Sequence, residues 1–360
     1  MADKSKKAPK VRVEASEEQV HRQRRLAVYA MFATAAFAAI VIGAVILLGH
    51  VAAQKSAAQD EVDIQNEPVM YDPFYVLLIG SDTRKGTALY TGKDNEQGQV
   101  EQYADIITLM RVDPQNYTIT LVTVPRDTVV EGDKGKINDA LISNEPLRVV
   151  EAVERLTGVR ADYYAMTTFA TFDAFIDAIG GIDVDVPVTV TVVDPMTAKK
   201  VTVKAGKNRH LNGAEALVFS RARKEYETDQ DALRQVNVRT VESAIINKVL
   251  NLGSELDLQE VLDAFEDNTV TNLDLSQVGS IAMDFMLHNS LVKIYSATGP
   301  YDGAERESDG LWVVDDDPET WGRIISLTDA GFDPAGVVEA PSFESDDDKD
   351  AEKAKDSKKQ

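Results

Sequence analysis

An uncharged apolar segment, from Leu26 to Val51, divides this chain into two parts of opposite charge. It contains no Asp, Glu, Lys or Arg, and at a rise of about 1.5 Å per residue a helix of this length crosses a bilayer. The basic run Arg22–Arg25 directly before it predicts a cytoplasmic N-terminus. We therefore expect a basic cytoplasmic tail (1–25), one transmembrane helix (26–51) and a body outside the cytoplasm.

A cleaved signal peptide is the alternative interpretation of this segment. The apolar core of a signal peptide is usually only about 7–15 residues long. The alanine pairs Ala52-Ala53 and Ala57-Ala58 provide small residues at which a signal peptide could be cleaved. The length of the segment favours an uncleaved anchor that holds the protein in the cell membrane.

The composition of the body excludes several classes of function. The chain of 360 residues has a net charge of -22, and residues 1–25 carry eight Lys/Arg against four Asp/Glu, so the remainder bears -26. Such a body repels nucleic acid, whose binding depends on neutralising phosphates. The absence of cysteine excludes disulfides, thiolate nucleophiles and cysteine zinc sites. The four histidines have no metal-ligand spacing; they are His21, His50, His210 and His288.

Alternating β-rich and helical patterns predict an α/β or α+β fold with a mixed central sheet between residues 71 and 340. The turn sequence Asp113-Pro114-Gln115-Asn116 joins two β-rich runs and predicts a hairpin. We expect a spacer at 52–70 and a disordered charged tail at 341–360. The expected strands are 74–80, 106–112, 118–124, 163–166 and the β-rich run 182–193, in which Pro187 marks an edge or a bulge. The expected helices are 145–156, 171–179, 213–220 and 234–250, and two or three weaker elements are expected within 255–335, including 280–287 and 291–296.

Charged residues stand at the predicted strand ends. Asp82 follows the first strand and Asp105 begins the second, so both carboxylates reach the same edge of the sheet and are candidate Mg²⁺ ligands. A turn or helix-capping role for Asp82 is the alternative. Arg126 ends the hairpin and is a candidate phosphate ligand, and Asp127 either joins the site or forms an ion pair with an arginine.

Four further arginines lie within twenty residues of this acidic body: Arg221, Arg223, Arg234 and Arg239. The guanidinium fork matches two phosphate oxygens at once, so the cluster is either an anion site or a set of internal ion pairs. Arg221 and Arg223 share a face only in an extended segment, which favours a strand or loop exit that lines one cleft. Asp231 lies three residues before Arg234, a spacing at which a helical ion pair is the alternative.

Between Phe74 and Leu250, which is half of the chain, several short sequence motifs resemble those of the LytR-CpsA-Psr (LCP) family of cell-wall glycopolymer transferases. Each motif alone is weak evidence for the family, but the order and spacing of the motifs together are specific. They are LLIGSDTR, AD followed by IITLMRVDPQNYTITLVTVPRDT, KIN, GVRADYYAMTTFATFDAFIDAIGGIDVDVP, LNGAEALVFSRAR and Asp-x-x-Arg.

The resemblance implies an LCP-type α/β/α sandwich with a mixed central sheet, preceded by one transmembrane helix. It implies a phosphotransferase that moves an anionic glycopolymer, such as teichoic acid, from an undecaprenyl-pyrophosphate carrier to a peptidoglycan hydroxyl as a phosphodiester. The implied partners are this lipid-linked polymer, peptidoglycan and the membrane, without nucleic acid. The alternatives are a non-catalytic polyprenyl-pyrophosphate-binding or scaffold protein of the envelope and, less favoured by the acidic body, a transcriptional attenuator.

The resemblance also implies roles for individual residues. Asp82 and Asp105 would bind Mg²⁺, with Mn²⁺ as a substitute. Asp231 would accept the proton of the acceptor hydroxyl or orient Arg234. The implied catalytic residues are Arg126, Arg221, Arg223 and Asp231, and the implied pyrophosphate ligands are Arg84, Arg126, Arg221, Arg223, Arg234 and Arg239. Four apolar residues would face the core or a lipid pocket from one helix: Phe169, Phe172, Phe175 and Ile176.

The chain departs from the family pattern at two positions that contact phosphate in the family. Tyr103 stands where the family usually has Arg, and Val238 stands where it usually has Gln. Arg84, Asn237 and Arg239 are the candidates that compensate for these changes.

Overall fold

The structure is a computed structural model that describes residues 72–83, 87–88, 102–130, 135–142, 144–226, 228–253 and 255–343. The predicted N-terminal tail, transmembrane helix and spacer, Arg84, and residues 344–360 of the predicted tail lie outside these ranges. Among the described helices, none combines the length and apolarity that crossing a membrane requires.

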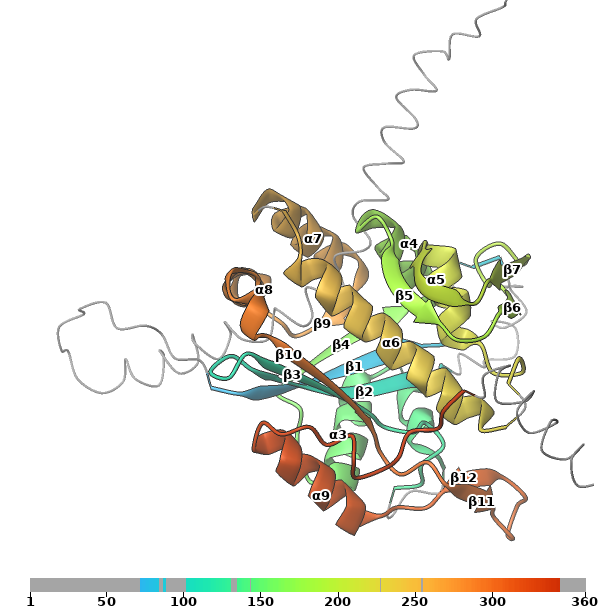
Figure 1. The fold of residues 1–360 in the computed structure, drawn as a ribbon. Helices are drawn as coiled ribbons and strands as arrows, with labels where there is room; N and C mark the ends of the chain where they lie inside the picture. Colours follow the sequence, from blue (N-terminus) through green and yellow to red (C-terminus); the bar gives the residue numbers. More distant parts are fainter. Residues whose placement is uncertain are drawn as a thin grey trace, which may run out of the picture.

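A mixed six-stranded sheet forms the centre of the molecule, with the strand order β10-β3-β2-β1-β4-β9 (Figure 1). β1 is antiparallel to β2 and parallel to β4, and β10 is parallel to β3. The arrangement confirms the expected mixed sheet and the β2–β3 hairpin. The strands are β1 Phe74–Ser81, β2 Ala104–Asp113, β3 Thr118–Thr123, β4 Tyr163–Thr168, β9 Val270–Thr271 and β10 Lys293–Thr298.

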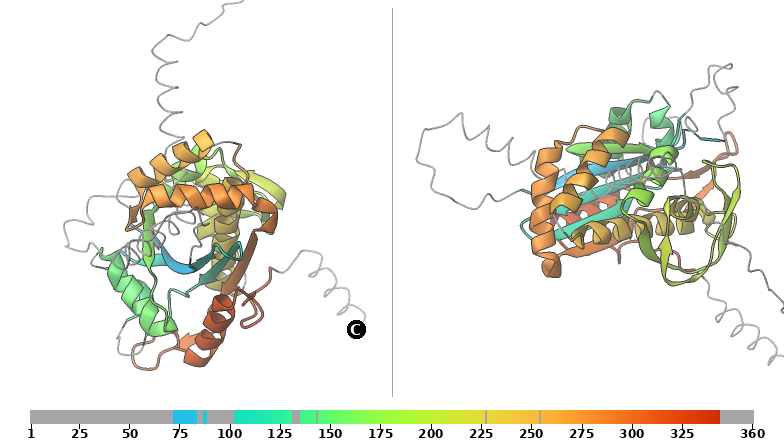
Figure 2. Two further views of the ribbon diagram at one scale, coloured as in Figure 1. Left: turned by 90° about the vertical axis from the view of Figure 1, so that its left-hand side faces the viewer. Right: turned by 90° about the horizontal axis from the view of Figure 1, so that it is seen from above.

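Helices cover both faces of this sheet, as the view along the strands in Figure 2 shows. Successive side chains of β1 point to opposite faces of the sheet, so Val76 and Leu78 belong to one apolar cluster, and Leu77 and Ile79 belong to the other. The first cluster includes residues of α4 Phe169–Ala178, α5 Gly213–Arg221, α6 Gln230–Leu250, α7 Glu255–Asn268 and α8 Leu275–Leu287. The second includes residues of the 3-10 helix η2 Ile137–Leu141 and of α3 Pro146–Thr157 and α9 Pro318–Asp329.

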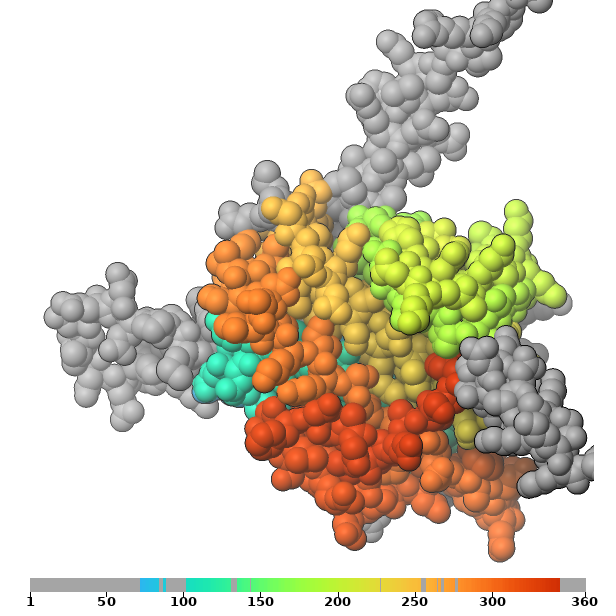
Figure 3. Space-filling model, in the orientation of Figure 1, coloured from blue at the N-terminus to red at the C-terminus, as the bar shows by residue number. Residues whose placement is uncertain are grey.

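Two small antiparallel sheets lie beside α5, in the lobe at the upper right of the space-filling view (Figure 3). The sequence predicts one continuous β-rich run at 182–193, but Pro187 divides it, since proline cannot donate a ladder hydrogen bond. Its two halves belong to different sheets. The pairs are β5 Ile182–Val186 with β8 Gly206–Leu211, and β6 Val190–Val193 with β7 Lys200–Val203.

The C-terminal part contains more structure than its sequence pattern predicts. β10 completes the central sheet by pairing with β3 over a long sequence separation, which local periodicity does not reveal. A short hairpin and a 3-10 helix were not predicted at all. They are β11 Gly303–Glu305, β12 Trp312–Val314 and η3 Asn289–Leu291.

α6 begins at Gln230, four residues before its predicted start at Arg234. Asp229 precedes it in a left-handed conformation with φ 44°. The extra turn begins with the polar Gln230 and Asp231 and continues with the buried Ala232 and Leu233, and it places Asp231 and Arg234 on the same helix.

Gly213 allows α5 to start directly against α4. A Cβ at this position would lie 1.9 Å from the backbone oxygen of Asp173. We therefore expect Gly213→Ala to lower the free energy of unfolding by about 2 kcal/mol, as overpacking does. Gly322 in α9 is the matched control, because a Cβ there would meet no neighbouring atom of the described chain within 4 Å, and Gly322→Ala should stabilise the helix slightly. Equal urea midpoints for Gly213→Ala and the wild type would contradict this account of the α4–α5 contact.

Candidate functional site

The candidate functional residues of three neighbouring strands lie at one end of the sheet. β1 ends just before Asp82, β2 begins one residue before Asp105, and β3 ends three residues before Arg126. The antiparallel registers of β1–β2 and β2–β3 place these segments at the same end. The structure thus brings together the two predicted carboxylates and the predicted hairpin arginine.

A β-bulge sets the position of Asp105. Gly80 pairs with Ile106, but Ser81 pairs with Ala104, so Asp105 is an extra residue on β2. A Cβ on Gly80 would lie 2.8 Å from Cβ of Ile106, so the close approach of the strands requires glycine here. Bulges of this kind redirect a side chain and often lie next to active sites.

Asp82 and Asp105 are each held by a donor. The backbone N–H of Tyr103 donates to Oδ1 of Asp82 at 2.8 Å, and Nη1 of Arg126 donates to Oδ1 of Asp105 at 2.5 Å. Within the described ranges, no cluster of three or more His, Cys, Asp or Glu side chains is suited to hold a metal by itself. Two oriented carboxylates fit Mg²⁺ in the manner of phosphate-transfer sites, where substrate phosphates and water complete the octahedron.

The carboxylate of Asp231 is the meeting point of three arginines. Its Oδ1 lies 3.3 Å from Nε of Arg126, 3.3 Å from Nε of Arg223 and 3.1 Å from Nε of Arg234. Nη2 of Arg234 and Nε2 of Gln235 donate to its Oδ2 at 3.2 Å and 2.9 Å. Three arginines from separate segments therefore converge on one carboxylate, and the internal ion pairs that the sequence offered as the alternative are present.

The electrostatics of this cluster favour an additional anion. Burial raises the pKa of Asp231, but Arg234 and Arg126 outweigh it and hold the pKa well below its usual value. Burial, and next the charge of Arg126, lower the pKa of the Arg223 guanidinium. The Nε atoms of Arg126 and Arg223 are buried and make no hydrogen bond within the described part of the chain, although both lie at ion-pair distance from Asp231. Buried donors without an acceptor are costly, so a bound anion would stabilise this arrangement.

Arg221 and Arg223 do not line the cleft in the way that their spacing predicts. Arg221 is the last residue of α5, and Arg223 lies beyond the extended residue Ala222. The guanidinium of Arg221 lies 4.6 Å from the ring centroid of Phe169 and donates to the backbone oxygen of Val193 at 3.1 Å. The prediction of one extended segment is wrong, because the helix continues through Arg221 and ends before Arg223.

Arg239 also lies outside the cluster around Asp231. It is a buried residue of α6. Its Nε donates to Oγ of Ser296 at 3.1 Å, and its Nη1 donates to Oγ1 of Thr123 at 2.7 Å. Asn237 is similarly occupied, since its Nδ2 donates to the backbone oxygen of Phe219 at 3.0 Å. Both residues fix α6 to its neighbours in this structure.

Lys136 is a residue of this site that sequence reasoning did not select. Its Nζ lies 2.7 Å from Oδ1 of Asp127, whereas Nε of Arg126 lies 3.8 Å from Oδ2 of the same carboxylate. The backbone N–H of Asn138 donates to the oxygen of Arg126 at 3.2 Å. The KIN string that carries the resemblance was the available signal, and its lysine neutralises Asp127 while the backbone holds the Arg126 segment.

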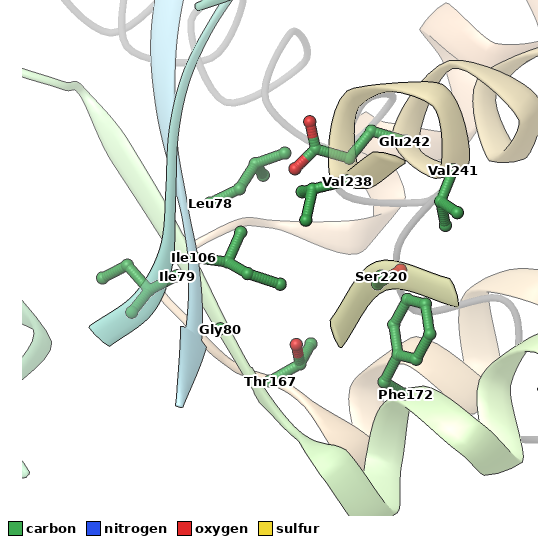
Figure 4. A pocket seen from close by; sticks show the side chains of 10 residues that line it. All are labelled: Leu78, Ile79, Gly80, Ile106, Thr167, Phe172, Ser220, Val238, Val241 and Glu242. Carbon is green, nitrogen blue, oxygen red and sulfur yellow. The ribbon is translucent and has the colours of Figure 1, made fainter. Parts of the chain in front are cut away.

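A small, mainly apolar cavity of ≈ 20 Å³ lies between the sheet and α4, α5 and α6 (Figure 4). Gly80 and Ile106 line it next to the strand ends that carry Asp82 and Asp105, and Phe172 lines it from α4. Of the four apolar α4 residues, Phe175 and Ile176 are core residues instead. The other lining residues are Leu78, Ile79, Thr167, Ser220, Val238, Val241 and Glu242. An apolar space thus begins beside the charged site.

Comparison with protein families agrees with this geometry. The model of the LytR_cpsA_psr family matches residues 46–319, which is more than half of the chain. The chain belongs to the LytR_cpsA_psr family. The match extends beyond the strings of the sequence resemblance and includes the C-terminal β10 and the hairpin of β11 and β12.

Members of the LytR_cpsA_psr family resemble this chain over most of their own length. The polyisoprenyl-teichoic acid–peptidoglycan teichoic acid transferase TagU of Bacillus mycoides is 30% identical over 245 residues, which cover 67% of this chain and 73% of that protein. TagU of Bacillus licheniformis is 32% identical over 238 residues, or 64% of this chain and 69% of that protein. The crystal structure of B. subtilis TagV has a TM-score of 0.58 at 22% identity and covers 72% of this chain and 98% of that chain. The TagV likeness establishes the shared fold.

Proposed function

We propose that this protein transfers an anionic, phosphate-linked glycopolymer from a polyprenyl-pyrophosphate carrier to a hydroxyl group of peptidoglycan. The observation that carries the proposal is the convergence of Arg126, Arg223 and Arg234 on Asp231 beside an apolar cavity. A lipid pyrophosphate carries a concentrated negative charge, which the converging guanidinium groups would neutralise. The TagU relatives are polyisoprenyl-teichoic acid–peptidoglycan teichoic acid transferases, which supports the same assignment.

The proposed reaction is a phosphoryl transfer. The acceptor oxygen forms a bond to the phosphorus that bears the glycopolymer, and the bond from this phosphorus to the bridging oxygen of the pyrophosphate breaks. Polyprenyl monophosphate leaves with the bonding electrons, and the hydroxyl proton passes to solvent or to the leaving phosphate. Arg126 and Arg223 stabilise the charge that develops on the phosphoryl oxygens, since their buried Nε–H groups make no hydrogen bond within the described part of the chain and can donate to the substrate.

Asp231 positions the arginines in this scheme. Because its pKa is held far below its usual value, it stays ionised and is a weak proton acceptor. Its carboxylate binds the three guanidinium groups at once and keeps them close together in the absence of substrate. This role replaces the proton-accepting alternative that the family resemblance suggests.

We infer that Asp82 and Asp105 hold Mg²⁺, or Mn²⁺ in its place, together with oxygens of the substrate pyrophosphate. The bound cation would neutralise charge on the phosphate oxygens during transfer. Oδ1 of each carboxylate is oriented by a protein donor, and Asp105 is additionally fixed by the bulge. Because Oδ1 of Asp105 accepts a hydrogen bond from Arg126, the proposed metal ligand is in direct contact with the arginine cluster.

Activity is therefore expected to depend on a divalent cation. Chelation by EDTA should abolish transfer, and Mg²⁺ or Mn²⁺ should restore it. Asp82→Asn and Asp105→Asn should raise the Mg²⁺ concentration needed for half-maximal activity, because each removes one anionic ligand. Asp302→Asn is a control outside the site. Full activity in EDTA would exclude the proposed metal role.

Transfer itself is tested with the intact protein, a polyprenyl-pyrophosphate-linked saccharide and peptidoglycan fragments. We expect saccharide phosphate to become attached to the fragments only when the acceptor, the lipid-linked donor and Mg²⁺ are all present. Saturable binding of the donor without any product would instead identify a lipid-binding or scaffold protein. Neither binding nor product, alongside an active TagU control, would reject the proposal.

The proposed substrate requires an envelope location. We infer that the acidic body lies outside the cytoplasm, with the segment Leu26–Val51 as a single membrane anchor and the basic residues before it on the cytoplasmic side. A reporter fused after Phe343 tests this orientation, since a cytoplasmic signal would contradict it.

A further inference from the structure

The hairpin of β11 and β12 presents an aromatic ring to solvent near the phosphate site. Trp312, the first residue of β12, is 52% exposed, whereas Val313 and Val314 after it are buried. Figure 1 shows the hairpin at the end of the molecule where α6 begins. Exposure of so large an apolar surface to water is unfavourable, so a ligand that covers the ring would gain from its burial.

Backbone hydrogen bonds fix this hairpin to the segment that carries Arg126. The N–H of Val314 donates to the oxygen of Asp127 at 3.0 Å, and the N–H of Val129 donates to the oxygen of Val314 at 2.9 Å. These bonds form a parallel bridge. The same register, continued two residues back along both segments, places Trp312 level with Arg126, roughly 7 Å along the chain from the bridge. Trp312 thus belongs to the surroundings of the phosphate site.

The indole ring of Trp312 is positioned by a glycine on the neighbouring strand. β11 and β12 are antiparallel and pair Gly303 with Val314 and Glu305 with Trp312. A Cβ on Gly303 would lie 2.9 Å from Nε1 and 3.1 Å from Cε2 of Trp312, so the ring packs against the bare backbone of this glycine. The ring is therefore in contact with β11, while about half of the residue stays open to a ligand.

Glu305 adds a hydrogen-bonding group to the same face of the hairpin. It is exposed and lies directly opposite Trp312 in the register, and paired residues of two strands project from the same face. The partially positive C–H groups of a pyranose ring stack favourably on the negative face of an aromatic ring. A neighbouring carboxylate accepts hydrogen bonds from sugar hydroxyl groups. The two side chains together are therefore suited to bind a sugar.

The charge of this region discriminates between the sugars of the reaction. Residues 302–319 carry eight Asp/Glu against one Arg, a net charge of -7. Such a surface repels the anionic glycopolymer of the donor and the headgroups of anionic lipids. The uncharged N-acetylglucosamine rings of peptidoglycan experience no such repulsion. An uncharged ring of the acceptor is the occupant that this surface fits.

We propose that Trp312 and Glu305 form a subsite for an uncharged sugar ring of the peptidoglycan acceptor, on the same chain as the ring whose hydroxyl receives the phosphate. This inference rests on the proposed function and names where its acceptor binds. The subsite contributes to acceptor binding and takes no part in the exchange of bonds at phosphorus. It lowers the acceptor concentration needed for transfer and leaves donor binding and the maximal rate unchanged.

Transfer kinetics of the full-length protein test the subsite. Trp312→Ala should raise the KM for soluble peptidoglycan fragments about tenfold, while kcat and the KM for the lipid-linked donor stay within about twofold of the wild type. Trp312→Phe keeps a ring that can stack and should recover most of this loss. Glu305→Gln should raise the same KM about threefold, because a neutral amide accepts weaker hydrogen bonds than a carboxylate.

Phe332 provides the matched control, because it is a 63% exposed aromatic residue at the opposite end of the sheet. It follows α9, whose Asp329 accepts a hydrogen bond from Tyr75 at the start of β1. Phe332→Ala should leave the KM for the acceptor unchanged. An equal rise in Phe332→Ala, an unchanged acceptor KM in Trp312→Ala, or a rise in the donor KM instead would overturn the inference.

A second measurement needs neither turnover nor a variant. The chain has two tryptophans, and Trp321 is only 1% exposed, so Trp312 is the one that a ligand reaches. Chitotetraose, an uncharged N-acetylglucosamine oligomer, should shift the tryptophan emission to shorter wavelength in a saturable way. A hyaluronan tetrasaccharide, whose alternate rings carry carboxylates, should bind about tenfold more weakly. No shift with chitotetraose, or equal binding of both, would overturn the inference, whereas absence of transfer by the wild type rejects the proposed function alone.

Discussion

Arg223→Ala is expected to lower the rate of glycopolymer transfer by about 100- to 1000-fold, the range seen when a transition-state donor is removed. Its side chain is 41% exposed and has a buried Nε that lies 3.3 Å from Oδ1 of Asp231. It contributes little to the core, so the folded state should persist. Acceptor-dependent transfer, measured beside far-UV circular dichroism and the melting temperature, separates loss of catalysis from loss of structure.

Three further variants serve as comparisons for Arg223→Ala. Arg223→Lys keeps the charge but loses the planar fork, so it should recover only part of the activity. Arg160→Ala removes an exposed arginine that pairs with Glu154 and should leave transfer unchanged. Arg221→Ala should cost less than Arg223→Ala, because Arg221 contacts Phe169 and Val193 instead of Asp231. A wild-type rate for Arg223→Ala would remove the basis of the proposed phosphate site.

Asp231→Asn is expected to impair both stability and activity. It leaves three close guanidinium groups without their shared carboxylate, and breaking a buried charge network costs about 3 kcal/mol or more. We expect a lower urea midpoint at pH 7 and at least a hundredfold slower transfer, because the arginines move apart. Asp309→Asn removes an exposed partner of Arg306 and is the matched control. An unaltered midpoint would show that Asp231 does not hold the cluster together.

The stabilisation by Asp231 should depend on pH in a defined direction. Because its pKa is lower in the folded protein than the ordinary value of 3.8, the ionised group stabilises the fold at neutral pH. The advantage of the wild type over Asp231→Asn should be complete above pH 3.8 and narrow as the pH falls further. Between pH 6 and 8 the two pH–rate profiles should have the same shape. An inflection present only in the wild type would restore the proton-accepting role.

The strands and helices with a clear period were predictable from the sequence. β1, the β2–β3 hairpin and α3 follow apolar alternation, turn chemistry and the proline and glycine at the helix ends. The order of Asp82 and Asp105 along these elements is sufficient to predict that they lie at the same edge of the sheet. Strands that follow one another closely along the chain can pair in only a few ways, so the positions of their ends are predictable.

The rest depended on contacts that local pattern does not encode. The spacing of Arg221 and Arg223 suggests a common cleft, but the end of α5 falls between them and separates their partners. The first turn of α6 begins with two polar residues, and the sequence pattern does not predict it as helical. Glu242 gave no signal in the sequence, because a single acid in an amphipathic pattern usually faces solvent. Only the packing of α6 on the sheet shows that it is buried.

The central claim is that the arginine cluster at the mouth of the apolar cavity binds the lipid pyrophosphate. A crystal structure with a polyprenyl pyrophosphate and Mg²⁺ tests it most directly. We predict phosphate oxygens within hydrogen-bonding distance of Nε of Arg126 and Arg223, the cation between Asp82 and Asp105, and the apolar chain beside Val238. A pyrophosphate bound elsewhere, with the three arginines still closed on Asp231, would contradict the claim.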